Sequence, residues 1–417
     1  MLPYAPGVST TPTVAFNPFE PGFFDDPYAQ YALLRTHDPV HHTPIGPVAL
    51  FRYEDVFTLL RDPTLSVDER NAEPFPVPED VAALVEGRED FGQLTMLNRD
   101  PPDHDRLRRL VSRVFTPRRI EQLRPRVTEL VDAALDAAAA SGVEMDVVAQ
   151  LAFPLPFQVI SDMLGMPEAD GAHMRDWSHT MTKMLDPIVA YDDVEAALHA
   201  SDSMLAHVRA AIAWKRREPA DDLLSALVSV ADDRTGEQLS EDELVAQVVL
   251  LYIAGHETTV NLIGNGVLAL LRHPGELARL RDDPSLDANA VEELLRYDSP
   301  VQFSRRITTR DVEIAGVPVP ARTFVMTCLA SANRDRAKWG PTADDLDLGR
   351  DGASQHVSFG SGVHYCLGAA LARLEGQVAI PRLVRRFPEL TLLDEQPVWG
   401  GRIVLRGLDR LRVSLAG

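Results

Sequence analysis

Apolar residues recur at helical spacing along most of this 417-residue chain, in runs that proline and glycine interrupt. The longest run begins at residues 240–243, Ser-Glu-Asp-Glu, a capping box in which the serine and glutamate side chains each satisfy a free backbone N–H group. It continues to Leu271, and residues 273–275 (His-Pro-Gly) end it. At ~1.5 Å per residue the predicted helix spans roughly 45 Å, enough to cross the molecule. Because it is so apolar, we expect it at the centre of the fold.

Shorter helices and a little strand surround this helix in the predicted fold. Helices are expected after Pro27, over 53–61, over 100–110, in pieces over 124–217, over 287–297 and after Cys366. Strands are expected as a hairpin of 40–42 with 47–52 and as a pair from Arg306 through Val317. Residues 62–99 have little periodicity, so we expect a long irregular stretch there, which inside a compact domain is either mobile or functional. The sequence thus predicts a mainly α protein with a minor β region: a lead-in over 1–25 without its own fold, and one domain over 26–417.

Composition narrows the classes of function. The chain is 45% hydrophobic, which lets a protein of this length bury a cofactor-sized cavity. Its 41 basic and 62 acidic side chains give a formal net charge of −21, which argues against nucleic acid or anionic lipid as a partner of the whole surface. The N-terminus has no signal-like pattern, and no window reaches the ~18–20 apolar residues of a membrane span. We therefore expect a cytoplasmic protein without a membrane anchor.

The two cysteines exclude a disulfide framework and a cysteine-rich zinc site, and they stand in different settings. Cys328 lies in an apolar run and is expected in the core. Cys366 lies within residues 359–368, Phe-Gly-Ser-Gly-Val-His-Tyr-Cys-Leu-Gly, whose glycines permit positive φ and close approach to a flat ligand. A helical run follows and puts the sulfur at a helix N-terminus, which favours thiolate over thiol. The plain alternative is a buried structural cysteine in a glycine-rich turn.

Residues 359–368 resemble the haem-binding loop of the cytochrome P450 family, Phe-Gly-x-Gly-x-His-x-Cys-Leu-Gly. The resemblance implies the fold of that family, with the long central helix over the haem. It also implies haem b (iron protoporphyrin IX) as cofactor, with its iron bound by Cys366. Phe359, His364 and Gly368 would then contact the cofactor, His364 toward a propionate. Taken alone, His364 could be an ordinary loop histidine.

The middle of the long helix breaks two local rules. Gly255 costs about 1 kcal/mol relative to alanine in a helix interior, and Glu257 is expensive to bury. The Thr258 hydroxyl can bond the carbonyl of Ala254, four residues back, which loosens the helix there. A zinc-protease helix is excluded, since Val260 stands where a second histidine is needed. The stretch resembles the oxygen-binding segment of the same family, which implies that Ala254 and Gly255 lie beside the haem and that Glu257 and Thr258 relay protons as acid and alcohol.

His104 and Arg108 lie one helical turn apart and share a helix face. On spacing alone this is a solvated basic face. The stretch also resembles the family's helix whose histidine and arginine hydrogen-bond haem propionates, and two donors one turn apart suit two carboxylates. By the same resemblance, Arg306 corresponds to a further propionate-binding arginine.

Glu293 and Arg296 are spaced to pair along one helix. Such a pair on a surface contributes only ~0.3–0.5 kcal/mol, and spacing alone favours that interpretation. The resemblance implies instead a buried brace for the segment before the haem loop. The arginine that usually completes this brace is replaced by Asp345, so we expect its third arm to be weakened.

The resemblance extends from about Asp26 to Leu415, through motifs in the family's order. It implies a haem-thiolate monooxygenase that uses O2 and two externally supplied electrons to hydroxylate or epoxidise a small molecule. The electrons are expected from a ferredoxin-type partner with its reductase, because the chain has no Rossmann fingerprint and no cluster of ligating cysteines. A peroxide-driven peroxygenase and a non-catalytic haem sensor are the alternatives. The family's specialised peroxygenases generally lack the acid–alcohol pair that stands here as Glu257 and Thr258.

Four arginines form a cationic cluster on this acidic chain: Arg106, Arg109, Arg113 and Arg119. We interpret them as a docking patch for an acidic iron–sulfur protein, because opposite charge steers association. An ordinary solvated face is the alternative.

A pocket for a large ligand is expected to be mostly apolar, with few polar groups. The candidate lining residues are Phe75, Phe91 and Leu94, then Met181, Met184 and Leu185, then Ile253, and finally Val301, Gln302 and Phe303. Only Gln302 among them offers a neutral hydrogen-bonding group. The set predicts a bulky, largely hydrophobic substrate such as a terpenoid, steroid or polyketide. The methionines would let a helical lid repack around several shapes, although they could equally be core residues.

Overall fold

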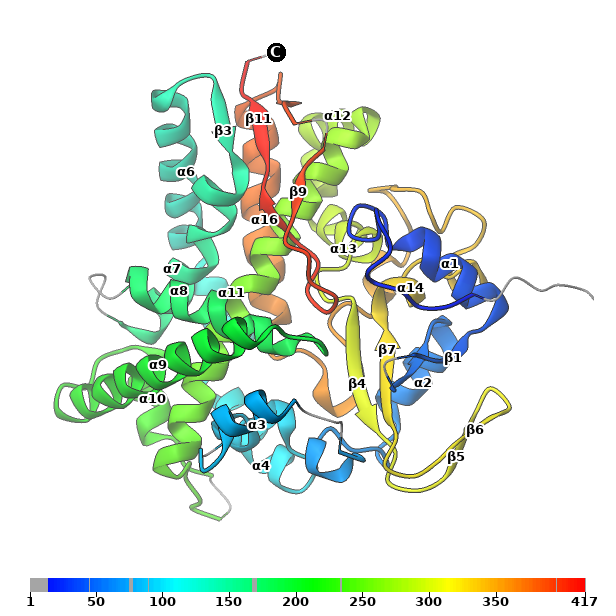
Figure 1. The fold of residues 1–417 in the computed structure, drawn as a ribbon. Helices are drawn as coiled ribbons and strands as arrows, with labels where there is room; N and C mark the ends of the chain where they lie inside the picture. The colour runs from blue at the N-terminus through cyan, green and yellow to red at the C-terminus, as the bar shows by residue number, and fades with distance from the viewer. Residues whose placement is uncertain are drawn as a thin grey trace, which may run out of the picture.

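The structure is a computed structural model that describes residues 14–44, 46–74, 78–88, 90–166, 171–232, 235–394 and 396–416. Helices fill most of the molecule, and a small sheet lies to one side with the N-terminal segment (Figure 1). The predicted class, mainly α with a minor β region, is confirmed.

Helix α11 (Glu241–Arg272) is the central element. Its first turn carries the predicted capping box: the Ser240 hydroxyl accepts from the Glu243 N–H at 3.2 Å, and the Glu243 carboxylate accepts from the Ser240 N–H at 2.9 Å. Most of its residues are buried, because α7 (Pro154–Leu164), α9 (Tyr191–Arg217), α13 (Asp287–Tyr297) and α16 (Ala369–Arg386) pack around it. The main hydrophobic core is built on these contacts.

The remaining helices are short or lie further out. They are α1 (Tyr28–His37), α2 (Tyr53–Arg61), α3 (Glu79–Val85), α4 (Asp103–Val114), α5 (Pro117–Gln122), α6 (Arg124–Ser141), α8 (Gly171–Met181), α10 (Leu223–Ser229), α12 (Pro274–Asp282), α14 (Leu329–Ala332) and α15 (Arg336–Trp339). Helices α8 and α9, with the turn η6 (Thr182–Leu185) between them, form what we call the lid.

The largest sheet has the order β1-β2-β7-β4 and is built from β1 (Val40–His42), β2 (Val48–Leu50), β7 (Phe324–Cys328) and β4 (Phe303–Ile307). β2 and β7 run parallel, and the other neighbours are antiparallel. The smaller sheets are β5 (Val312–Ile314) with β6 (Val317–Val319), β9 (Val398–Trp399) with β10 (Leu408–Arg410), and β3 (Glu144–Asp146) and β8 (Thr391–Leu392) on either side of β11 (Arg412–Ser414).

One expectation about this architecture was wrong. The stretch 62–99 is not irregular throughout, since it contains α3, a two-turn helix that buries no side chain and therefore has no periodic apolar signal. The described part of the lead-in packs against the domain. Phe16 and Phe23 are buried in an aromatic cluster in which the Phe16 ring lies 5.5 Å from that of Phe303.

Candidate active site

The loop over residues 359–368 folds tightly against α2. Gly360 and Gly362 have φ of 70° and 73°, the left-handed region that glycine enters without strain. A Cβ on Gly362 would lie 2.7 Å from the carbonyl oxygen of Leu60, so no side chain fits there. The Cys366 N–H donates to the Phe359 carbonyl at 2.9 Å. These contacts fix the loop and hence the position of its cysteine.

The Cys366 thiol precedes α16 and is solvent-accessible, although it lies deep in the protein. Burial raises the pKa of this thiol above its ordinary value, while the backbone N–H groups of Gly368 and Ala369 and the charges of Arg108 and Arg373 partly oppose the rise. As expected, the N–H groups at the helix start favour thiolate, but desolvation of the thiol outweighs them. A bound cation deprotonates such a thiol outright, which is the role that iron would have here.

The centre of α11 presents a short accessible stripe. Ala254 is exposed and Thr258 is half-buried, although they lie in an otherwise buried helix. As predicted, the Thr258 hydroxyl donates to the Ala254 carbonyl, at 2.8 Å. A Cβ on Gly255 would lie 3.1 Å from Ile160, so close packing against α7 explains this glycine.

Glu257 is buried and has two partners that the sequence did not reveal. Its Oε2 lies 3.0 Å from Nδ1 of His179 on α8, and its Oε1 lies 3.6 Å from Nη1 of Arg402 in the loop between β9 and β10. Burial by itself raises the pKa of Glu257, but the hydrogen bond from His179 and the positive charge of Arg402 oppose this rise, and the pKa is lowered. Nothing near Glu257 in sequence marks these partners, because they come from distant segments.

The four predicted propionate ligands are hydrogen-bond donors that have few acceptors around them. His104 is buried, and its ring lies 4.2 Å from that of His364. Burial, together with His104 and the nearby arginines, lowers the pKa of His364 to about 3. Burial lowers the pKa of Arg306 to about 10, and its guanidinium donates only to the carbonyls of Arg305 and Leu60, at 2.6 and 3.0 Å.

This donor cluster fits the carboxylates of a haem. Nε2 of His104 is buried without a hydrogen-bond partner in the part of the chain that the structure describes. Arg108 donates to the Tyr365 carbonyl at 2.6 Å. Within the described ranges, neither Arg108 nor Arg306 forms an ion pair with a carboxylate. Buried cationic groups ordinarily need such a partner, and propionates would supply it.

The predicted Glu293–Arg296 brace is present and fully buried, with two hydrogen bonds of 2.7 and 2.8 Å. Its third arm is not missing. Arg350 donates from Nε to both Glu293 oxygens at 3.1 and 3.2 Å, while the residue that the sequence pointed to, Asp345, contributes its main-chain carbonyl to Arg296 at 2.8 Å. The expectation of a weakened arm was wrong, because the arginine stands five positions further along the chain.

A second ionic link, which sequence reasoning missed, joins α13, the helix that carries Glu293 and Arg296, to α16. Glu292 accepts from Arg373 of α16 at 2.6 and 3.0 Å and lies 3.2 Å from Nε2 of His356. Burial opposes ionisation, but His356 and Arg373 hold the pKa of Glu292 at about 2. The Arg373 guanidinium also lies 4.6 Å from the ring centroid of Phe359, so Arg373 connects α16 both to α13 and to the loop over residues 359–368.

The predicted pocket residues fall into two groups. Those that keep accessible surface are Phe91, Leu94, Met181, Met184, Leu185, Ile253 and Val301. Gln302 and Phe303 are buried at 2% and 3%, so the interpretation of these two as pocket lining was wrong. The Gln302 amide donates to the Ser299 carbonyl at 2.6 Å, and Phe303 packs in the aromatic cluster with Phe16. Phe75 lies outside the described residues.

The predicted docking cluster is not a patch of free positive charge. Arg106 pairs with Glu243 and Arg109 with Asp232, Arg119 lies 3.8 Å from Asp221, and Arg113 donates to the Ala231 carbonyl at 2.6 Å. Acidic neighbours therefore offset much of its charge.

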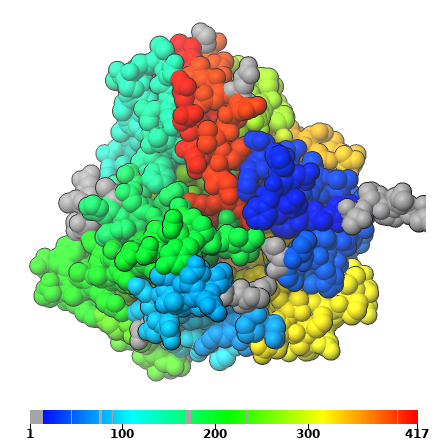
Figure 2. All heavy atoms as spheres, viewed as in Figure 1, coloured from blue at the N-terminus to red at the C-terminus, as the bar shows by residue number. Residues whose placement is uncertain are grey.

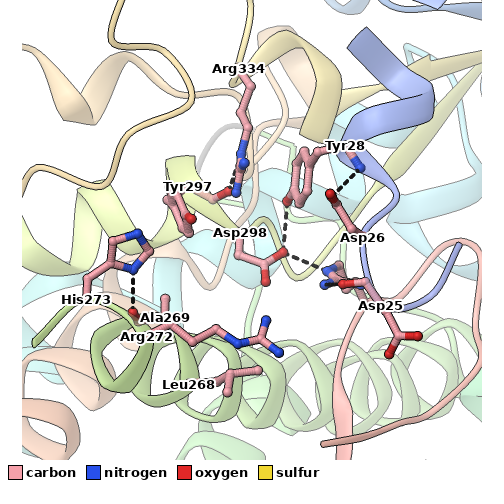
Figure 3. Close-up of a pocket in the computed structure, with 11 residues that line it drawn as sticks. Asp25, Asp26, Tyr28, Leu268, Ala269, Arg272, His273, Tyr297, Asp298 and Arg334 are labelled. Carbon is pink, nitrogen blue, oxygen red and sulfur yellow. Dashed lines mark hydrogen bonds and ion pairs between the residues drawn. The ribbon is translucent and has the colours of Figure 1, made fainter. Parts of the chain in front are cut away.

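A small polar pocket of about 220 Å³ lies at the C-terminal end of α11, beside Tyr28 and Asp298 (Figure 3). The Tyr28 hydroxyl and Nε of Arg406 both donate to Oδ1 of Asp298 at 2.8 Å. None of the predicted site residues lines it, so it is separate from the region of Cys366 and Thr258.

Comparisons with known proteins agree with this fold. The sequence profile described as "Cytochrome P450" matches residues 71–398. The chain belongs to the cytochrome P450 family.

Among its relatives, the Vitamin D(3) 25-hydroxylase of Pseudonocardia autotrophica is 46% identical over 415 residues, which cover 98% of each chain. The 6-deoxyerythronolide B hydroxylase of Saccharopolyspora erythraea is 41% identical over 411 residues, 95% of this chain and 97% of that one. The solved structure of PksS, the cytochrome P450 of the bacillaene polyketide synthase of Bacillus subtilis 168, superposes with a TM-score of 0.87 at 35% identity, covering 96% and 100% of the two chains.

The chain is thus a cytochrome P450 monooxygenase, an enzyme of the class that binds haem b through a cysteine thiolate. Among the described residues, no helix is long and apolar enough to cross a membrane.

Proposed function

We propose that this monooxygenase hydroxylates or epoxidises a bulky, largely hydrophobic small molecule of the terpenoid, steroid or polyketide kind. In this proposal Cys366 holds the haem iron, and Glu257 with Thr258 delivers protons. The observation that carries it is the accessible stripe of Ala254 and Thr258 on an otherwise buried helix. An opening at that place, next to a buried carboxylate, is what oxygen activation beside a hydrophobic substrate requires.

The side chains that would hold haem b follow from the donor cluster. Cys366 binds the iron, His104, Arg108, Arg306 and His364 take the propionates, and Phe359, Gly368, Ala254 and Gly255 lie beside the ring. When bound, the haem supplies O2 activation, which thiolate ligation assists by favouring O–O cleavage. The protein's own part is to position the substrate and to control protons.

The proton relay rests on the states of two side chains. The Thr258 hydroxyl donates its hydrogen bond to the Ala254 carbonyl, so the lone pairs of its oxygen remain free to accept a hydrogen bond. The lowered pKa of Glu257 keeps its carboxylate ionised at neutral pH, so Glu257 must gain a proton each time before it can deliver one. A buried carboxylate that must be protonated repeatedly needs a supply of protons from solvent.

The substrate class rests on the accessible apolar residues and on the relatives. Ile253 of α11, Val301 before β4 and Met181 at the end of α8 are partly accessible and carry no charge. Two relatives are named for the hydroxylation of vitamin D(3) and of 6-deoxyerythronolide B. Both lines of argument favour a large, uncharged skeleton over a small polar metabolite.

Electrons come from a ferredoxin-type partner with its reductase in this proposal. Acids offset much of the charge of the predicted docking cluster. Charge reversal at Arg109 and Arg113 tests what the cluster still contributes, because it should slow reduction by the partner but leave chemical reduction unchanged. The acid–alcohol pair favours the monooxygenase over a peroxide-driven enzyme, which would not need a proton relay. A haem sensor would not need the acid–alcohol pair.

The proposal is tested by optical titration of the haem protein with matched ligands: a steroid and its sulfate, a macrolactone and its ring-opened acid, and a small polar acid. We expect the large neutral member of each pair to displace the water on iron at least about tenfold more tightly, since an unpaired charge is costly to bury. Ile253→Phe should weaken the large ligands, whereas Val143→Phe, at an exposed position outside the site, should not. Tight binding of the small acid alone would overturn the substrate class, and equal binding by Ile253→Phe would remove Ile253 from the pocket.

A further inference from the structure

The buried carboxylate of Glu257 has two polar contacts, and they differ in what they can do with a proton. Arg402 is permanently protonated and can only donate hydrogen bonds. His179 carries an imidazole, the one side chain that ordinarily gains and loses a proton between pH 5 and 8. Its side chain is 37% exposed, whereas that of Glu257 is 10% exposed. Among the described contacts of Glu257, His179 alone therefore reaches solvent and can carry a proton.

The neighbouring His256 does not offer a second route. It is fully buried, and its Nε2 bonds the Phe153 carbonyl at 2.9 Å. Burial lowers the pKa of His256 to about 4, so it stays neutral. The other charged groups that face this cluster are Arg175 of α8 and Asp186 after η6. Arg175 cannot release a proton, and Asp186 accepts from backbone N–H groups.

The contacts of His179 also fix where its proton sits. Nη2 of Arg402 lies 3.3 Å from Nε2 of His179, and a guanidinium only donates, so Nε2 accepts. The proton of the neutral ring is then on Nδ1, the nitrogen that lies 3.0 Å from Oε2 of Glu257. Arg402 thereby holds His179 in the tautomer that donates to Glu257.

Arg402 itself is held between the lid and the body of the protein. Its Nη1 donates to the Thr182 hydroxyl at 2.6 Å, and the next two backbone N–H groups in its loop donate to Asp186 at 3.1 and 2.8 Å. At the other end of the loop, Arg406 is fixed by its hydrogen bond to Asp298. The C-terminal segment lies between the lid and the N-terminal segment in Figure 2. Arg402 thus contacts two residues of the lid, His179 and Thr182, while it lies beside Glu257.

We propose that His179 is the proton inlet of this enzyme, handing protons from solvent to Glu257, and that Arg402 is the positioning residue that orients it when the lid is closed. The inference rests on the proposed role of Glu257 in the relay. In the step, a hydronium ion of the solvent gives a proton to Nε2 of His179 as that nitrogen leaves Arg402, water is left behind, and the Nδ1 proton passes to Oε2 of Glu257. The carboxylate becomes a carboxylic acid, the imidazole stays neutral as its other tautomer, and no electron moves. The starting tautomer returns when the exposed ring exchanges protons with solvent, losing the proton on Nε2 and gaining one on Nδ1.

The test compares His179→Asn with Glu257→Gln in the haem protein supplied with ferredoxin, reductase and a bound substrate. Asparagine keeps an N–H donor near the position of Nδ1 but cannot carry a proton. We expect both variants to lose product per reductant oxidised and to release peroxide instead, with the proton-dependent step slowed about tenfold or more. His173→Asn, on the same helix and exposed, is the matched control and should behave as wild type.

A second readout does not depend on turnover. ¹⁵N-histidine NMR of the reduced, carbon monoxide-bound protein, which is diamagnetic, should show His179 protonated on Nδ1 alone. Arg402→Gln should convert that signal into a tautomer mixture, while folding and ligand titration stay unchanged.

The possible results separate the two ideas. If Glu257→Gln loses coupling and His179→Asn does not, Glu257 relays protons but the inlet is elsewhere. If neither variant loses coupling, the proposed relay through Glu257 fails as well. An Nε2-protonated His179 in the wild type would overturn the role of Arg402 whatever the turnover shows.

Discussion

Replacement of Arg350 tests the brace as the structure defines it. Arg350→Met removes the two hydrogen bonds to Glu293, at 3.1 and 3.2 Å, and those to the carbonyls of Thr342 and Asp345, at 2.8 and 3.0 Å. A broken buried pair costs ~3–5 kcal/mol when one charge is left alone, but Glu293 keeps Arg296 at 2.7 and 2.8 Å. We therefore expect a loss of about 2–3 kcal/mol, on the order of 100-fold in the unfolding equilibrium.

The matched control is Asp345→Ala, because Asp345 is exposed and gives the brace only its main-chain carbonyl. It should change stability by no more than ~0.5 kcal/mol. Urea unfolding of the haem protein, followed by the haem absorbance, measures both variants. If Asp345→Ala were as destabilising as Arg350→Met, the brace would depend on the aspartate side chain and the assignment of the third arm to Arg350 would be wrong.

Three further predictions concern the site. Cys366→His should still bind haem but lose the red-shifted band of the reduced carbon monoxide complex, and a wild-type spectrum would remove Cys366 as the ligand. Thr258→Ala should keep consuming reductant and O2 while releasing more peroxide and less product, and unchanged product per electron would exclude Thr258 from the relay. Burial raises the pKa of Glu375 to about 8, above its unfolded value near 4.5, so the wild type loses stability as pH rises from about 4.5 to 8. Glu375→Gln should remove this loss, so its melting temperature relative to wild type should rise across that window, and a constant difference would contradict the shifted pKa.

Much of the fold could be predicted because its signals are local. Helix α2 covers the predicted residues 53–61, and the capping box before α11 forms both of its hydrogen bonds. Local signals disappear where an element buries little or pairs far away. Helix α3 buries no side chain, and the three-residue strand β3 pairs with β11 near the other end of the chain.

The site shows the same division. The motifs around Cys366 and Thr258 were recognisable because their residues are consecutive, and the Thr258 hydrogen bond is a property of one helical turn. The partners of Glu257 were not, because His179 and Arg402 reach it from the lid and from the C-terminal loop. Gln302 and Phe303 were misplaced because an apolar run does not reveal which face of the strand meets the core.

The close approach of Gly362 to the Leu60 carbonyl bears on how the enzyme is made in the cell. A ribosome adds ~5–20 residues per second, so the loop that holds the iron emerges on the order of 15–60 s after the helix on which it rests. The parallel pairing of β2 with β7 is delayed in the same way. The helices that are synthesised first therefore keep their apolar faces exposed until the later segments are made. A stable haem complex can form only near the end of synthesis. A ribosome-bound chain stopped before residue 359 should accordingly acquire no thiolate-ligated haem, however much haem is supplied.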